Sequence, residues 1–143
     1  ALRASTDDPT DQKQKRIAYY NYVAEALGPT VSIVQDLDDG QAGFGCFWGE
    51  VNSNVHKALG CLGTVTNGGI RDLTEFADGF QGLAGAITPS HANVHLVDVG
   101  GEVNVSGMVV YSVFVKSEKV RIKATLSFIR EMYHRVNKRR SDM

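Results

Sequence analysis

The chain has 143 residues, a length that suits one domain with a moderate core and not two independent cores. Its hydrophobic fraction of 43% and charged fraction of 22% are those of a soluble globular protein, and its net charge of -1 gives no general attraction to nucleic acid or an anionic membrane. No apolar stretch approaches the ~20 residues that span a bilayer. The 15 glycines indicate several tight turns or close backbone approaches.

The two cysteines, Cys46 and Cys61, form no C-x-x-C pattern, so we interpret them as small core residues in a reducing cytoplasm. The chain begins Ala1-Leu2-Arg3-Ala4-Ser5, without an initiator Met and without the apolar core of a signal peptide. We therefore expect a cytoplasmic protein whose numbering begins inside a longer gene product.

Hydrophobic periodicity and turn residues predict the secondary structure in chain order. The first half is expected to contain a loose arm and helix start over 1–16, a helix over 17–27, a strand over 31–36, a glycine-rich loop over 36–49, a helix over 51–59, a strand over 62–67, a turn at 68–69 and a short helix over 71–77. The second half is expected to contain strands over 82–87, 94–99, 102–105 and 108–115, a helix over 124–136 and a basic tail over 138–140. The alternation in the first half is typical of an α/β domain.

The first helix is expected to bury Ile17, Tyr20, Val23, Ala24 and Leu27. The second helix carries an apolar stripe on one side, made of Val51, Val55, Ala58 and Leu59. His56 lies away from this stripe, so we expect it to be solvated.

Residues suited to chemistry occur in two segments, 47–52 and 68–72, each placed after a predicted strand and at the start of a predicted helix. In an α/β layout such junctions gather on one rim of the sheet, where ligands commonly bind. The amides of Glu50, Val51 and Asn52 would be free donors of a helix N-terminus and so an anion site. Gly49 would let a ligand approach the backbone closely.

Arg71 offers a bidentate fork for a carboxylate, and Asp72 is a hard oxygen ligand suited to Mg²⁺ or Mn²⁺. Together they could hold a 2-oxo acid and a metal. A structural interpretation stays open, because an Arg-Asp pair at a helix start is often a solvated cap. Glu50 in a first turn also favours the helix dipole without any chemistry.

These segments resemble the RraA-like family over about residues 30–110, with tryptophan, glycines, acid and Arg-Asp in register. The matching stretches are Phe47-Trp48-Gly49-Glu50-Val51, Lys57-Ala58-Leu59-Gly60, Gly63-Thr64-Val65-Thr66-Asn67-Gly68-Gly69-Ile70-Arg71-Asp72 and His91-Ala92-Asn93-Val94-His95-Leu96.

The family includes 4-hydroxy-4-methyl-2-oxoglutarate aldolases that also decarboxylate oxaloacetate, and these carry an acid, twenty intervening residues and then Arg-Asp. This chain has Glu50, twenty residues and then Arg71-Asp72. The resemblance therefore implies a lyase that acts on small 2-oxo acids with Mg²⁺ or Mn²⁺. It also implies one domain over 1–143, complete or lacking terminal or loop segments, with a swivelling β/β/α architecture (an α-β-β-α sandwich) and assembly as a homotrimer or hexamer.

Carried over by position, the resemblance implies that the backbone of Gly49, Glu50, Val51 and Asn52 binds substrate. Arg71 would bind the pyruvyl carboxylate, and Asp72 would coordinate the metal. Glu50 would contact water on the metal or help proton transfer.

The chain departs from the family pattern at three places. The aldolases usually have Asp where Glu50 stands, which puts aldol cleavage in more doubt than decarboxylation. An acid is common where this chain has Asn67, and after Val110 the usual Pro-Gly-Asp turn is replaced by Tyr111-Ser112-Val113-Phe114.

Other features indicate alternatives. The main rival function is a non-catalytic interaction protein that regulates a ribonuclease, as some relatives do, although those tend to lack the acid that Glu50 supplies. His91 and His95 are interpreted as hydrogen-bonded core or interface residues, because a four-residue step on a strand spans ~13 Å and suits no shared metal. Gly43-Phe44-Gly45 lacks the frame of a nucleotide loop, which argues against a methyltransferase.

Overall fold

The computed structural model describes residues 2–4, 9–26, 29–38, 40–91 and 94–111, which belong to one compact unit, Ala1–Ser112. The predicted helix over 124–136 and the basic tail lie outside the described residues. So do Leu27 and the end of the strand predicted over 108–115.

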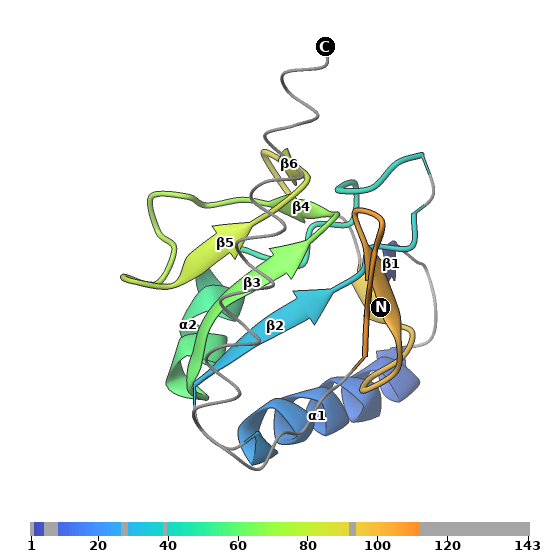
Figure 1. The fold of residues 1–143 in the computed structure, drawn as a ribbon, viewed down its shortest axis with the longest axis vertical. Helices are drawn as coiled ribbons and strands as arrows, with labels where there is room; N and C mark the ends of the chain where they lie inside the picture. Colours follow the sequence, from blue (N-terminus) through green and yellow to red (C-terminus); the bar gives the residue numbers. More distant parts are fainter. Residues whose placement is uncertain (1, 5–8, 27–28, 39, 92–93, 112–143) are drawn as a thin grey trace. The chain divides into compact units, whose positions relative to one another are not determined.

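Helices and strands alternate from β1 to β3, and the described elements after β3 are strands; the mixture of helices with parallel strands confirms the α/β class (Figure 1). The elements are β1 (Leu2–Ala4), α1 (Pro9–Glu25), β2 (Thr30–Val34), α2 (Glu50–Ala58), β3 (Cys61–Thr66), β4 (Gly69–Ile70), β5 (Gln81–Leu83), β6 (Ala86–Ile87), β7 (Val94–Leu96), β8 (Val103–Val105) and β9 (Met108–Val110).

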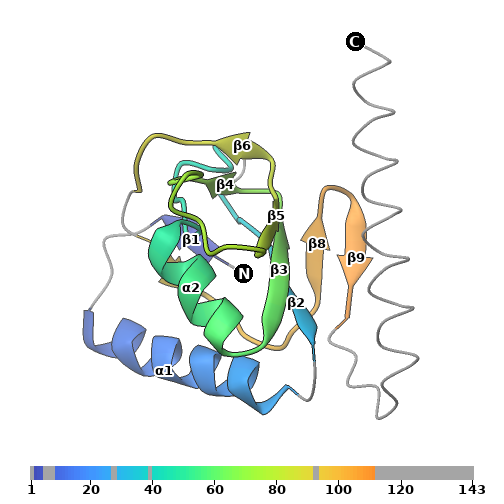
Figure 2. The same ribbon diagram turned by 90° about the vertical axis from the view of Figure 1, so that its left-hand side faces the viewer.

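The central sheet has three parallel strands in the order β2-β3-β5. Parallel neighbours need a crossover connection, and α2 supplies it between β2 and β3. In Figure 2, α2 lies on one side of this sheet and the antiparallel β8–β9 hairpin lies toward the other. β1 pairs antiparallel with β7. The sandwich layering that the resemblance implies stays a prediction.

β4 and β6 form a second parallel pair, and each follows a strand of the first sheet in sequence, β3 and β5 respectively. The predicted site residues Arg71 and Asp72 come directly after β4. Trp48 forms an isolated parallel bridge with Ile70, so the segment before α2 lies beside β4. The strand predicted over 82–87 is divided between β5 and β6, which pair with different partners. It bends at Gly85, whose amide donates to Gly68 O at 2.9 Å.

The prediction of a short helix over 71–77 is wrong. Gly69 and Ile70 are a strand paired with β6, and residues 71–80 form turns. Asp72 has a φ of 52°, which is the left-handed region, and a residue in that conformation interrupts a right-handed helix.

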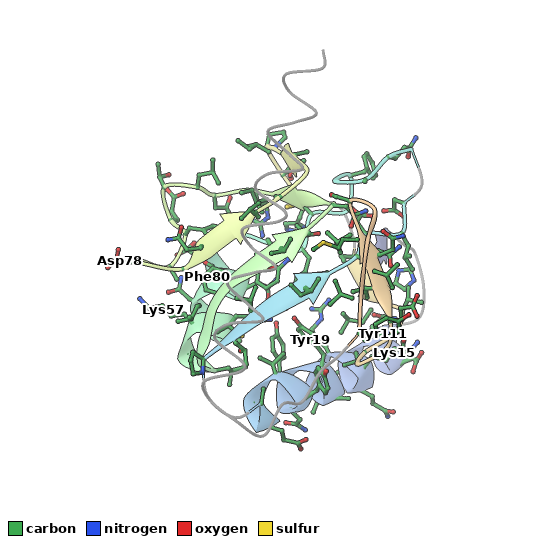
Figure 3. All side chains as sticks on the ribbon, viewed as in Figure 1. Lys15, Tyr19, Lys57, Asp78, Phe80 and Tyr111 are labelled. Carbon is green, nitrogen blue, oxygen red and sulfur yellow. The ribbon has the colours of Figure 1, made fainter. Side chains whose placement is uncertain are left out.

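The first helix begins at Pro9, well before the predicted start, and proline is favourable in a first turn. Its predicted inward face is partly wrong, because Ile17 is 52% exposed and Ala24 is also exposed. Val23 is buried as predicted, and Tyr19 is buried beside it. In Figure 3, Tyr19 points from α1 toward the sheet.

The buried side of α2 is polar, which is the opposite of the prediction. Val51 on the apolar stripe is 65% exposed, whereas Ser53 and His56 are both 0% exposed. His56 is therefore not solvated as expected. The physical reason is that both buried side chains have hydrogen-bond partners, so their burial leaves no unsatisfied group.

The core lies between α1, α2 and the sheet and is rich in aromatic residues. Its buried members are Tyr19, Val23, Val34, Phe47, Trp48, Cys61, Ile70, Ala77, Phe80 and Leu96. Cys46 and Cys61 are free, buried thiols, which confirms their interpretation as core residues.

Candidate active site

The predicted site lies where the first turn of α2 meets the end of β4. The Arg71 amide donates to Trp48 O at 3.0 Å, which extends the bridge between Trp48 and Ile70. Gly49 follows Trp48 and is the N-cap of α2, in an extended conformation with φ -164° and ψ -163°. The backbone pairing therefore brings the helix start and the Arg71-Asp72 pair together, although the two segments are far apart in sequence.

Gly49 allows this close packing because it has no side chain. A Cβ built at Gly49 would lie 2.6 Å from Asp72 Oδ2 and 3.0 Å from Arg71 Cζ. Contacts under 3.0 Å essentially never occur for real Cβ atoms, so a larger residue would displace the pair. The side chains of Arg71 and Asp72 therefore occupy the space over Gly49, and the approach of a ligand to the Gly49 backbone stays a prediction.

Arg71 and Asp72 form an ion pair between Arg71 Nη1 and Asp72 Oδ2. Their side chains are 22% and 28% exposed, so the pair is half-buried yet open to solvent. Asp72 Oδ2 also accepts a long hydrogen bond of 3.4 Å from the Glu50 amide. Asp72 thus faces the helix N-terminus, where the positive end of the helix dipole favours a carboxylate.

The start of α2 keeps donors for an anion. Gly49 supplies no side-chain cap. Among the described residues, the amides of Val51 and Asn52 have no hydrogen-bond acceptor. The Glu50 side chain is exposed and makes no described hydrogen bond or ion pair. This arrangement is what an anion site at a helix N-terminus requires.

Arg71 also has an unused donor. Its Nε is buried and has no hydrogen-bond partner within the described part of the chain. Because Nη1 contacts Asp72, the Nε edge of the guanidinium is the one left for a second carboxylate. A buried donor without an acceptor is unfavourable, so an incoming carboxylate oxygen would stabilise this edge.

Asp72 has a carboxylate oxygen that could bind a metal ion. Both of its hydrogen bonds fall on Oδ2, and Oδ1 has no protein donor among the described residues. Those residues include no group of three or more His, Cys, Asp or Glu side chains that could enclose a metal ion. Mg²⁺ commonly uses one or two carboxylates and completes its shell with water and substrate oxygens, so the donors present fit such an ion.

Asn67 and Asp36 are two polar residues at the ends of β3 and β2. The resemblance singled out Asn67, whereas the sequence alone indicated no role for Asp36. Asn67, where relatives often have an acid, accepts from the Asp36 amide and donates to Asp36 O, both at 2.8 Å. It ties the end of β2 to the end of β3. An ionised Asp has no donor and could make only one of these bonds. Asp36 is buried, and its carboxylate accepts from the amides of Asp38 and Gly43 in the glycine-rich loop.

Cys46 lies beneath the site and holds two backbone segments together. Its thiol is 3.2 Å from both Trp48 O and Gly69 O, and it is 2% exposed. Burial raises the pKa of the Cys46 thiol, which keeps it protonated as a donor.

The supports that sequence analysis missed are side chains on α1 and α2. Tyr20 donates to Asn52 Oδ1 at 2.7 Å, Asn52 Nδ2 donates to Phe47 O, and Ser53 Oγ accepts from the Ala77 amide at 3.0 Å. Their only sequence signal is the set of polar residues on the side of α2 opposite the apolar stripe.

Comparison with known protein families assigns the chain to one of them. A family model described as RraA-like (Aldolase/RraA) matches residues 11–115. The chain belongs to the RraA-like family. The family match includes every predicted site residue and extends beyond the stretch from 30 to 110 that carries the resemblance.

The RraA-like chain is similar to the solved structure of the RNA-processing inhibitor RraA from Thermus thermophilis, with 23% sequence identity and a TM-score of 0.47. The match covers 77% of this chain and 62% of that one. No curated protein matches the chain. Among the described helices of this RraA-like chain, none has the length and apolar character needed to cross a membrane.

Proposed function

We propose that the chain is a lyase that depends on Mg²⁺ or Mn²⁺ and cleaves a carbon–carbon bond in small 2-oxo acids. The substrates would be oxaloacetate, by decarboxylation, and 4-hydroxy-4-methyl-2-oxoglutarate, by retro-aldol cleavage to pyruvate. One observation carries the proposal: a guanidinium and a carboxylate, Arg71 and Asp72, lie against Gly49 at a helix N-terminus that still has free amides. Membership of a family described as Aldolase/RraA agrees with it.

The chain's own groups would bind and orient the 2-oxo acid. The free edge of Arg71 would bind the pyruvyl carboxylate, and the amides of Val51 and Asn52 would donate to substrate oxygens. Holding both ends of the 2-oxo acid orients the bond that breaks, which is a large part of what a positioned site supplies. Positive charge on Arg71 and the helix N-terminus would stabilise the negative charge that develops on the pyruvyl oxygens.

Asp72 Oδ1 would hold the divalent ion, which when bound acts as a Lewis acid on the substrate oxygens. In aldol cleavage the distal hydroxyl loses its proton, the bond between the carbinol carbon and the adjacent methylene breaks, and its electron pair passes toward the 2-oxo group. Glu50 would take that proton through a water molecule, since its carboxylate is exposed beside the helix N-terminus. Oxaloacetate releases CO₂ with the same electron movement and needs no such base. In both reactions the former methylene carbon then takes up a proton from water, which gives pyruvate.

We propose a cytoplasmic homotrimer or hexamer that works on a free small molecule, without nucleic acid or membrane. The net charge of -1 is compatible with this, because it gives no general attraction to either polyanion.

The test is pyruvate release from oxaloacetate with and without Mg²⁺, corrected for the rate that Mg²⁺ gives without protein. Asp72→Asn removes the charge but tolerates the left-handed backbone, because Asn adopts that conformation readily. We expect it to lower the metal-stimulated rate by on the order of 100-fold. Asp78→Asn, an exposed carboxylate in the same 71–80 segment, is the matched control and should keep the wild-type rate. Absence of pyruvate release from every 2-oxo acid tested would overturn the proposal.

A further inference from the structure

His56 is fully buried in α2, six residues after the helix begins, and its ring lies among aromatic side chains. Its centroid is 4.5 Å from that of Trp48 and 5.5 Å from that of Tyr19. His56 Nδ1 lies 2.6 Å from the main-chain oxygen of Asn52, and Nε2 lies 2.7 Å from the Tyr19 hydroxyl. Both ring nitrogens are therefore satisfied inside the core, which a buried imidazole requires.

The chemistry of the partners fixes the direction of these hydrogen bonds. The Asn52 carbonyl can only accept, so Nδ1 carries the proton and Nε2 of the neutral ring is an acceptor. Tyr19 must then donate its hydroxyl proton to Nε2, and its oxygen accepts from Ser32 Oγ at 3.2 Å. Burial lowers the pKa of His56, in agreement with a neutral ring. A single directed chain runs from β2 through α1 to the first turn of α2.

Asn52 connects this chain to the site. Its carbonyl accepts from His56, its Oδ1 accepts from Tyr20 at 2.7 Å, and its Nδ2 donates to Phe47 O. Phe47 precedes the Trp48-Gly49 segment that pairs with β4. Two adjacent tyrosines of α1 are therefore linked by hydrogen bonds to the residue whose amide lies in the proposed anion site, Tyr20 directly and Tyr19 through His56.

We propose that Tyr19, Tyr20 and His56 are positioning residues, which hold the first turn of α2 so that its free amides and Gly49 face the Arg71-Asp72 pair. This inference rests on the proposed function for its effect on substrate, and it adds α1 to the parts of the chain on which the site depends. The hydroxyl groups touch no reacting atom, and they act through Asn52.

Three tyrosines on α1 provide a matched test. Tyr19→Phe and Tyr20→Phe each remove one hydroxyl from the chain that holds Asn52 and keep the packed ring. Tyr22→Phe is the control, because the Tyr22 ring lies beside Gly100, with Cε2 3.4 Å from a Cβ built there, and the tyrosine that donates to Asn52 Oδ1 is Tyr20. The measurements are the dissociation constant for pyruvate with Mg²⁺, and the exchange rate of the Ser53 amide, which donates to Gly49 O at 3.0 Å.

We expect Tyr19→Phe to weaken pyruvate binding by on the order of tenfold and to speed Ser53 exchange by a similar factor, because a small misplacement of binding groups has a large effect on a site. Tyr20→Phe should do the same, and Tyr22→Phe should do neither. A thermal melt of each variant distinguishes a general loss of stability from a loss of positioning. A purely structural hydroxyl would lower the melting temperature and leave the affinity of the folded protein for pyruvate unchanged.

The outcomes separate this inference from the proposed function. Wild-type protein that binds no pyruvate would count against the proposed function, and Ser53 exchange would then decide alone whether the tyrosines hold the first turn. If Tyr19→Phe and Tyr20→Phe exchange Ser53 at the rate of Tyr22→Phe, the inference is wrong. It is also wrong if exchange accelerates while a measurable pyruvate affinity stays the same.

Discussion

Gly49 lies directly against the carboxylate of Asp72, so that a Cβ at Gly49 would come within 2.6 Å of Asp72 Oδ2. The backbone at Gly49 is extended, with φ -164°, and any residue can adopt it. The requirement for glycine is therefore one of space and not of backbone conformation. This distinction makes Gly49 a clean probe of the site.

Gly49→Ala is expected to push the side chains of Asp72 and Arg71 away from the helix N-terminus, because the atoms that a Cβ would meet are side-chain atoms of a partly exposed pair, whereas the backbone of Gly49 is held by pairing on both sides. The metal-stimulated release of pyruvate from oxaloacetate should fall by about 100-fold, as for other small misplacements of binding groups. Gly82→Ala in β5 is the control, since its Cβ would meet Phe76 Cε1 at an ordinary 3.4 Å. Wild-type activity in Gly49→Ala would show that the pair does not act at this position.

Glu50→Gln is expected to separate the two proposed reactions. Aldol cleavage needs a base for the distal hydroxyl, and loss of a general base typically lowers a rate by about 100-fold or more. Decarboxylation of oxaloacetate needs no such base and should change little. Both rates are measured as pyruvate release, with Glu75→Gln as the control for loss of an exposed carboxylate nearby. Equal losses in the two reactions would assign Glu50 to binding and not to proton transfer.

The position of the site was predictable from sequence, although the local structure of one half of it was not. Glycines, tryptophan and Arg-Asp placed at strand ends indicated that residues 47–52 and 68–72 would meet, and the bridge between Trp48 and Ile70 brings them together. The helix predicted at Arg71-Asp72 is absent because the backbone of Asp72 adopts a left-handed conformation, which interrupts a right-handed helix. Asp adopts that conformation as a single residue more readily than most residues do, but the local sequence does not require it here. The pairing of β4 with β6 and with Trp48, which ends at Ile70 and Arg71, involves segments distant in sequence.

The orientation of α2 could not be predicted, for a reason that applies to any pattern of apolar residues. Periodicity assumes that the apolar side of a helix is the buried one. Here Ser53 and His56 are buried because their partners, Ala77 and Tyr19, come from distant segments of the chain. Hydrogen-bond partners of this kind leave no local signal. The same is true of Asn67, whose two bonds to the Asp36 backbone explain why an amide suits that position.

The buried His56 also makes stability depend on pH. Its ring is desolvated, its described neighbours are the neutral groups Tyr19, Tyr20, Phe47 and Trp48, and burial lowers its pKa below the ordinary value near 6.5. The unfolded chain therefore takes up a proton at a higher pH than the folded chain does. This contribution to the free energy of unfolding is present in full above the ordinary pKa, and it is lost as pH falls from there through the pKa of the folded state.

We therefore expect the free energy of unfolding, measured with urea between about pH 8 and pH 5, to decrease below about pH 6.5, with His56 adding up to ~1.4 kcal/mol per pH unit to the slope. His56→Gln removes the titrating ring and should lose that part of the slope, whatever its effect on stability at pH 8. Comparing slopes and not absolute stabilities cancels the cost of the lost Tyr19 and Asn52 contacts. Identical slopes in the two proteins would mean that the imidazole is not held neutral in the core, and the directed chain from Ser32 to Asn52 would then be wrong.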